Sequence, residues 1–221
     1  MRDLRTLFHS ASWVGLLALL LMSTSVYADD TQAAADQVSK EAEAIHNAIM
    51  SLTDYDVFDW VTFDIQGPTV ILNGYASRPI LKNSVQNVVA EVPGVKDVMN
   101  NIKVLPLSSY DDQLRTRLYF KIYDYSPLAQ YNPNWGTPLF NSAARMTSGL
   151  TYDPPSGPHS IHIIVDNGHV ILEGVVNTEG DRILAGSQAR STAGVFSVEN
   201  DLAVLHGSAK NKKSNNSSSN G

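Results

Sequence analysis

The sequence predicts an α+β fold made of two αββαβ modules, each with a small three-stranded mixed sheet and two helices packed on one of its faces. The first observation behind this prediction is a repeat: Val-Ile-Leu-Asn-Gly at 70–74 returns as Val-Ile-Leu-Glu-Gly at 170–174. Residues 94–105 return in the same register from 194, and 10 of the 17 aligned positions are identical. Composition alone would give about one identity, so the chain is a duplication.

The second observation is the periodicity of the first module. Apolar positions three and four apart predict a helix, and alternating apolar and polar residues predict half-buried strands. The expected elements, in order, are a helix over 33–52 (Val38, Ala42, Ile45 and Ile49 inward), strands over 61–65 and 70–73, a helix from Pro79 to about Val92, and a strand over 95–105.

The third observation is the hairpin and crossover of the second module. Asn167-Gly168 is a strong two-residue turn signal, because both positions need positive φ. This turn sets Val165 opposite Val170. The residues expected in the core are Ile161, Ile163, Val165, Val170 and Leu172, and those expected on the outer face are His162, Ile164, Asp166, His169, Ile171 and Glu173. A crossover helix over 179–193 makes the second and third strands parallel.

A long irregular insertion separates the first helix of the second module, residues 111–125, from its first strand. Residues 126–158 contain six prolines. A loop of this length is usually functional or disordered. Its apolar side chains predict that it packs partly on a module: Tyr131, Trp135, Leu139, Phe140 and Tyr152.

The ends of the chain differ from its middle in composition. Residues 1–28 combine a basic start, a short apolar run and small residues before Ala28, which predicts a secretory signal cleaved after Ala28. We expect the first module over 29–106, the second over 107–206, and a disordered polar tail over 207–221. The chain has no cysteine, which excludes a lipid-anchored lipoprotein and disulfides. These features predict an exported protein, periplasmic or extracellular.

The charge of the body limits the class of partner. Residues 29–206 carry 11 Lys and Arg against 21 Asp and Glu, a net charge of −10. Because phosphate binding needs clustered positive charge, this balance argues against nucleic acid. It also disfavours broad adhesion to anionic lipid, although a local basic face could still bind it.

Four glycines mark backbone positions shared by the two modules. Gly74 and Gly174 are expected where a strand turns toward the crossover helix, and Gly94 and Gly194 just after that helix, where positive φ is common. We interpret all four as structural, since none stands in a phosphate-binding loop.

The repeated motif resembles the BON domain of bacterial osmotically inducible and nodulation proteins. The second copy carries it as Asn167-Gly168-His169-Val170-Ile171-Leu172-Glu173-Gly174 with 194–204, and the first as 67–74 with 94–104. The resemblance covers about 36–206, apart from 126–158. It implies non-catalytic modules of the bacterial envelope, which bind phospholipid membranes or partner proteins and are often linked to envelope or osmotic stress. No cofactor is implied.

Two hypotheses follow for the function. The first is a module that contacts phospholipid or an envelope protein without catalysis, and the second is a protein–protein adaptor that never touches lipid. An enzyme is disfavoured, because no Gly-x-Ser-x-Gly elbow and no nucleophile with an adjacent base occur. The oligomeric state is left open.

The second hairpin contains candidate metal ligands, which ordinary cross-strand pairs also explain. The candidate ligands are His159, His162, His169, Asp166 and Glu173. The pairs His162/Glu173 and His169/Asp166 lie at opposite ends of the hairpin, whereas a metal needs ligands that converge on one point. Solvent-exposed pairs explain the same residues, so no metal is expected.

The candidate binding surface is the first helix of the second module. Leu114, Leu118, Ile122 and Tyr125 have helical spacing and should face the core. The cations and tyrosines then expected on or near the outside are Arg115, Arg117, Tyr119, Lys121 and Tyr123, a combination suited to a membrane surface or an acidic partner. The alternative is a solvated face whose tyrosines pack on the neighbouring module or the long loop. The outer pair Ile164/Ile171 marks either the meeting point of the modules or a partner site.

Overall fold

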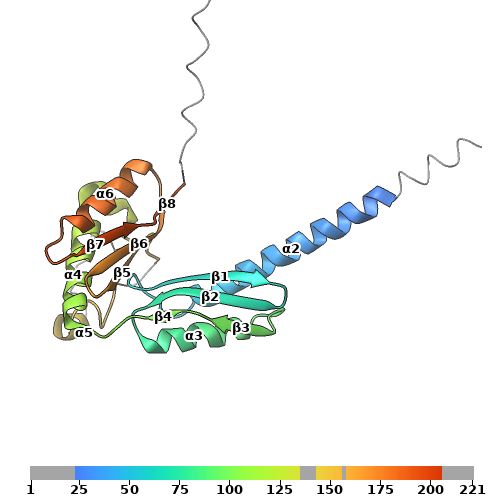
Figure 1. Cartoon of the computed structure of the whole chain (residues 1–221), viewed down its shortest axis with the longest axis horizontal. Coiled ribbons are helices and arrows are strands. Elements are labelled where there is room, and N and C mark those ends of the chain that lie inside the picture. The colour runs from blue at the N-terminus through green and yellow to red at the C-terminus, as the bar shows by residue number, and fades with distance from the viewer. Residues whose placement is uncertain (1–22, 135–142, 156–157, 206–221) are drawn as a thin grey trace, which may run out of the picture. The chain divides into compact units, whose positions relative to one another are not determined.

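The computed structural model of this protein describes residues 23–134, 143–155 and 158–205 (Figure 1). The described part divides into two units, one ending at His46 and one beginning at Asn47. None of the helices in these residues is long and apolar enough to cross a membrane. Most of the expected signal peptide and the whole polar tail from 207 lie outside the described residues, so both stay predictions.

The first module has the predicted order of elements. They are α2 (Ser23–Met50), β1 (Trp60–Gln66), β2 (Thr69–Ala76), α3 (Pro79–Ala90), β3 (Asp97–Asn100) and β4 (Lys103–Val104). β1 is antiparallel to β2, whereas β3 and β4 both run parallel to β2. The mixed sheet is therefore confirmed.

The second module repeats this topology around an insertion. Its elements are α4 (Ser109–Tyr123), the 3-10 helix η1 (Ser126–Tyr131), α5 (Ala143–Ser148), β5 (Ile161–Asp166), β6 (His169–Val176), α6 (Glu179–Arg190), β7 (Ser197–Asn200) and β8 (Ala203–Val204). β5 is antiparallel to β6, and β7 and β8 are parallel to it. The α+β class and the two-module architecture are confirmed.

The third strand of each sheet is broken, whereas the sequence predicted one continuous strand. In the first module the break falls between Asn100 and Lys103. The Asn100 side-chain amide donates to the Lys82 carbonyl of α3 at 2.8 Å, and its oxygen accepts from the Ile102 amide. The Asn100 side chain at this break thus links the third strand to the crossover helix.

The second hairpin has the predicted register. Val165 lies opposite Val170 and Ile163 opposite Leu172. Asn167 and Gly168 have φ of 52° and 81°, as a two-residue turn of this kind requires.

The core of the second module lies on one face of its sheet. All five predicted strand residues are buried there, together with residues of α4 and α6. The helical contributors are Leu114, Leu118, Tyr119, Ile122, Tyr123, Ala185 and Ala189. The same core also contains Val57 and Phe58, which precede β1 in the chain, so the second module does not complete its interior from its own residues.

The first helix differs from its prediction in length and in the depth of its apolar stripe. α2 begins at Ser23, ten residues before the predicted start. Ile45 and Ile49 are buried and Ala42 is half-buried, as predicted, but Val38 is 51% exposed. Spacing identified the stripe without showing where along the helix burial begins.

The insertion packs in part, as predicted. Leu128, Tyr131 and Leu150 are buried in the core of the second module. Tyr152, however, is 74% exposed, so its side chain contributes little to this packing. Trp135, Leu139 and Phe140 lie outside the described residues.

Candidate functional site

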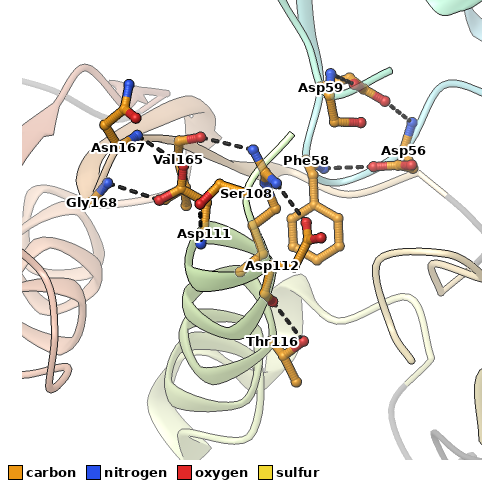
Figure 2. A network of polar contacts seen from close by, with 12 residues as sticks. Asp56, Phe58, Asp59, Ser108, Asp111, Asp112, Thr116, Val165, Asn167 and Gly168 are labelled. Carbon is orange, nitrogen blue, oxygen red and sulfur yellow. Dashed lines mark hydrogen bonds and ion pairs between the residues drawn. The ribbon is translucent and has the colours of Figure 1, made fainter. Parts of the chain in front are cut away.

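The amino end of α4 is fixed to the turn of the second hairpin. Ser108 caps the helix by accepting from the Asp111 amide. The Asp111 carboxylate is fully buried and accepts from the amides of Asn167 and Gly168, each at 2.9 Å (Figure 2). A carboxylate that accepts two turn amides replaces the water which those amides lose on burial. This contact sets which side of α4 faces the sheet.

Arg115 was predicted on the outside of α4, and this is wrong. Its side chain is only 4% exposed. One guanidinium nitrogen donates to the Val165 carbonyl at 2.8 Å and another to the Asp112 carboxylate at 2.7 Å. Because both partners belong to the fold of the module, Arg115 acts as a structural cation.

Tyr119 and Tyr123 were also predicted near the outside and are fully buried. The tyrosine rings lie 4.8 Å apart, and His159 contacts both. The Tyr123 hydroxyl donates to the Ile161 carbonyl of β5. The prediction assumed one narrow apolar stripe, but α4 buries a stripe about twice as wide. The alternative, in which the tyrosines pack on the neighbouring module or the long loop, is right that they are buried, but they lie in the core of the second module itself.

Two of the five predicted surface residues remain outside. Arg117 and Lys121, one helical turn apart, are both exposed. Arg117 donates to the Ala193 carbonyl at 3.0 Å, and Tyr110, earlier on α4, donates to the Gly194 carbonyl. These contacts join the exposed face of α4 to the loop after α6.

An exposed aromatic side chain extends this face, and the sequence reasoning missed it. Phe196 is 69% exposed and its ring stacks on Tyr110 with centroids 6.0 Å apart. Its position in the repeat is occupied in the first module by Lys96, so comparison of the two copies could have identified it. We call Tyr110, Arg117, Lys121 and Phe196 the α4 surface.

The four glycines adopt positive φ, which favours glycine. Gly74 and Gly174 have φ of 117° and 116°. They lie within β2 and β6, whereas the sequence predicted them at the ends of these strands. A Cβ at either position would overlap the carbonyl oxygen of Trp60 or Ser160. Gly94 and Gly194 have φ of 107° and 96° in the loops after the crossover helices.

The residues weighed as metal ligands do not converge. Asp166 pairs with Lys103 at 2.5 Å, and His169 bonds the Ser197 hydroxyl at 2.7 Å. His162 packs against aromatic rings. Among the residues that the structure describes, no group of three or more His, Asp or Glu could hold an ion.

The outer face of β5 was predicted to be exposed, and this is wrong. His162 is 7% exposed and Ile164 is fully buried. The His162 ring lies between Tyr55 and Trp60 of the first module, with centroids 5.6 and 5.0 Å away. Of the two roles considered for Ile164, these neighbours favour the meeting point of the modules.

The free edge of β5 is also covered by the first module. The Ile163 amide donates to the Val57 carbonyl at 2.8 Å, and the next residue, Phe58, is buried in the core of the second module. Lys103 of β4 reaches Asp166 at the end of β5. We call this contact between residues 55–60 and β5 the module joint. The sequence could not show it, because no pattern within β5 marks an edge that another segment covers.

A pair of buried carboxyls holds the 55–60 segment in shape. Asp59 accepts from the amides of Ser77 and Asp56, and Asp56 accepts from the Phe58 amide. Arg78 pairs with Asp56 at 2.9 Å. Burial, and then the neighbouring Asp59 carboxylate, raise the pKa of Asp56 to about 8, and burial raises that of Asp59 as well.

Burial has opposite effects on two residues that face each other across β5 and β6. It lowers the pKa of His162 to about 4, since the imidazolium would lose its hydration. It raises the pKa of Glu173 to about 7, with further contributions from Asp201 and Glu199. Both groups therefore favour their neutral forms.

Comparison with protein families decides what these modules are. The BON domain model matches residues 61–106 and 142–206, which together make up half of the chain. The chain belongs to the BON domain family. No curated protein matches it. Similar solved structures include two of CdsD, described as a structural protein of the type III secretion system of Chlamydia trachomatis. The chain is 17% identical to each, with a TM-score of 0.23 over 74% of this chain and 91% or 96% of theirs.

The first helix of each BON module lies outside the residues that the family model matches. The first match begins at Val61, after α2, and the second begins at 142, after α4. The shared BON pattern therefore describes the sheet and crossover helix, including the asparagines at the break in the third strand. α4, which carries three of the four residues of the α4 surface, lies between the two matched regions.

Proposed function

We propose that this BON protein is a non-catalytic envelope module whose α4 surface binds anionic phospholipid membranes. BON domains are generally non-catalytic, and BON proteins are commonly periplasmic. The single observation that carries the proposal is the α4 surface, where Phe196 is 69% exposed beside the exposed cations of α4. A role in envelope or osmotic stress belongs to the same proposal.

The chemistry of the α4 surface suits a bilayer interface better than free solution. An exposed aromatic ring gains by entering the headgroup region, and each cation near an anionic leaflet contributes about 1 kcal/mol. The body as a whole is acidic, with a net charge of −10 over 29–206, so a local basic face sets the orientation in which it approaches an anionic membrane.

Cosedimentation of the purified mature protein, residues 29–221, with liposomes tests the proposal. With vesicles that contain phosphatidylglycerol we expect binding, and with pure phosphatidylcholine much less. Arg117→Glu with Lys121→Glu should lower the affinity about 100-fold or more, because each reversal removes one attraction and adds one repulsion. Phe196→Ser should lower it about tenfold.

The matched control is Lys96→Glu, which reverses an exposed cation at the position equivalent to Phe196 in the first module. It should leave binding nearly unchanged. Equal binding by the control and the α4 variants would contradict the proposal. If no vesicle binds the chain while envelope proteins do, the adaptor hypothesis takes its place.

A further inference from the structure

We propose that the outer edge of β1 is an interaction surface for a second copy of this chain, which binds through its own β1 as an antiparallel neighbour. The proposal is independent of lipid binding. It rests on a difference between β1 and β5, the two edge strands that the duplication made equivalent.

The outer edge of β5 is covered within the chain. Three groups from outside the sheet bond the backbone of Ile161, Ile163 and Val165. The side chains of these three residues are fully buried. The covering groups are, in the same order, the Tyr123 hydroxyl, the Val57 carbonyl and the Arg115 guanidinium.

β1 presents three residues at the corresponding edge of the first sheet, where it is the outer strand (Figure 1). A two-residue loop joins β1 to β2, so alternate residues of β1, counted back from Gln66, bond β2. The amides and carbonyls of the residues between them point away from the sheet. These outward residues are Val61, Phe63 and Ile65.

Most of this edge is open. The Tyr55 hydroxyl bonds the Val61 amide. In the described part of the chain, however, no group bonds the outward amide or carbonyl of Phe63 or Ile65. Both side chains are half-buried, whereas their counterparts on β5 are fully buried. The first sheet therefore has an unpaired edge beside an incompletely covered core.

β1 lacks the features that usually keep an edge strand from pairing. It is seven residues long and contains no proline or lysine. The opposite edge of the same sheet is protected, because β3 has only four residues and the Asn100 side chain bonds the Lys82 carbonyl and the Ile102 amide. Strand addition to this sheet is therefore favoured at β1.

The side chains of β1 favour a second β1 as the added strand. In an antiparallel pair centred on Phe63, the two Phe63 rings are neighbours, and Val61 of each copy lies opposite Ile65 of the other. On the opposite face, Asp64 lies opposite Thr62, whose hydroxyl can donate to it. A shift toward the loop would place the two Asp64 carboxylates opposite each other, which is destabilising, and a shift the other way would leave Ile65 unpaired. Charge and apolar contact thus select the same register.

This contact would close two open edges at once. The Phe63 amide of each copy donates to the Phe63 carbonyl of the other, and each Ile65 amide donates to a Val61 carbonyl, while Tyr55 keeps the Val61 amide. The chain already uses this kind of contact on β5, where an extended segment supplies a backbone carbonyl and the buried Phe58 side chain.

Sedimentation velocity of the mature protein, residues 29–221, measures the association. We expect a reversible dimer when the concentration is raised from about 1 to 200 µM, in salt that screens the repulsion between two acidic bodies. Thr62→Asp places an Asp opposite each Asp64 and should weaken the dimer about fivefold, whereas Thr62→Lys forms two ion pairs and should strengthen it by a similar factor. Thr62 is exposed, so neither change disturbs a core. The matched control is Asn87→Asp, which adds the same charge at an exposed site on α3 and should have little effect.

The absence of cysteine allows a test of the register itself. In the proposed pair, residues 62 and 64 of the two copies have Cα atoms about 4.5 Å apart, within the range of a disulfide. We would mix the Thr62→Cys and Asp64→Cys variants, oxidise them, and identify the linked peptides by mass spectrometry, with far-UV circular dichroism as a check on folding. Thr62→Cys mixed with Gln66→Cys is the control for register and should crosslink several times more slowly.

A dimer that responds in opposite directions to the two Thr62 variants and crosslinks 62 to 64 supports the proposal. The proposal is overturned if the protein stays monomeric over the whole concentration range, or if Thr62→Asp and Thr62→Lys have the same effect. A dimer that crosslinks 62 to 66 as fast as 62 to 64 also overturns it.

Discussion

In the two BON modules, different side chains accept a hydrogen bond from the backbone amide that follows the second strand. The amide that follows β2, Ser77, donates to the Asp59 carboxylate at 2.6 Å. Its counterpart after β6, Asn177, donates to the Tyr131 hydroxyl at 2.7 Å. Asp59 comes directly before its sheet, whereas Tyr131 comes from the insertion. In both modules the amide that follows the second strand needs a hydrogen-bond acceptor. Which residue provides it depends on the segment that lies nearby.

The modules also differ in how they complete their interiors. The core of the second module includes Phe58 and Val57 from the chain before β1, as well as side chains from its own insertion. The crossover helices differ too, since Thr178 caps α6 while Arg78 makes no side-chain cap at α3. The two modules therefore share the same sheet but differ in the helices and segments that pack on it.

The largest expected effect comes from removing the side chain that the first module contributes to the core of the second. Phe58→Ala removes a ring that is 1% exposed and leaves a cavity in the core of the second module. We expect a loss of about 3–5 kcal/mol in the free energy of unfolding, measured by urea denaturation. Phe196→Ala, at a ring 69% exposed, is the control and should change stability by about 0.5 kcal/mol or less. Equal losses would show that Phe58 does not serve that core.

A smaller effect sharpens the comparison of the two hairpin turns. Asp111→Ala leaves the amides of Asn167 and Gly168 without their acceptor. In the first module the position of Gly168 is taken by Pro68, which has no amide to satisfy. We expect Asp111→Ala to cost about 2–3 kcal/mol, with faster hydrogen exchange confined to residues 166–169. Asp64→Ala, at an exposed residue of β1, should cost little. Unchanged exchange at the turn would contradict this role of Asp111.

The smallest effect concerns pH. Glu173 has a pKa raised to about 7 in the folded state, so the folded chain binds its proton more tightly than the unfolded chain does. The contribution of this group to the free energy of unfolding is fully present below pH 4.5 and is lost as the pH rises through 7. The equivalent residue in the first module is Asn73. Glu173→Asn should therefore stabilise the protein at pH 8 by about 1 kcal/mol, after allowance for solvent screening, and have little effect at pH 4. Thermal melts at the two pH values measure this, and a gain of equal size at both would rule out titration of Glu173 as the cause.

Local pattern was sufficient for the elements and their register. The Asn167-Gly168 turn fixed which residues of β5 and β6 face each other, because a two-residue loop allows one pairing and strand side chains alternate between faces. The repeat of 70–74 at 170–174 predicted two copies of one parallel crossover, and the family match agrees with this. These features depend on neighbours in sequence, so the sequence alone determined them.

Which faces meet solvent was decided only in three dimensions. Arg115, Tyr119 and Tyr123 have the composition of a binding surface, yet they lie inside because α4 is covered on two sides. His162 and Ile164 alternate like exposed residues, yet the first module covers them. Periodicity reports the direction in which a side chain leaves the backbone, and burial depends on what a distant segment places there.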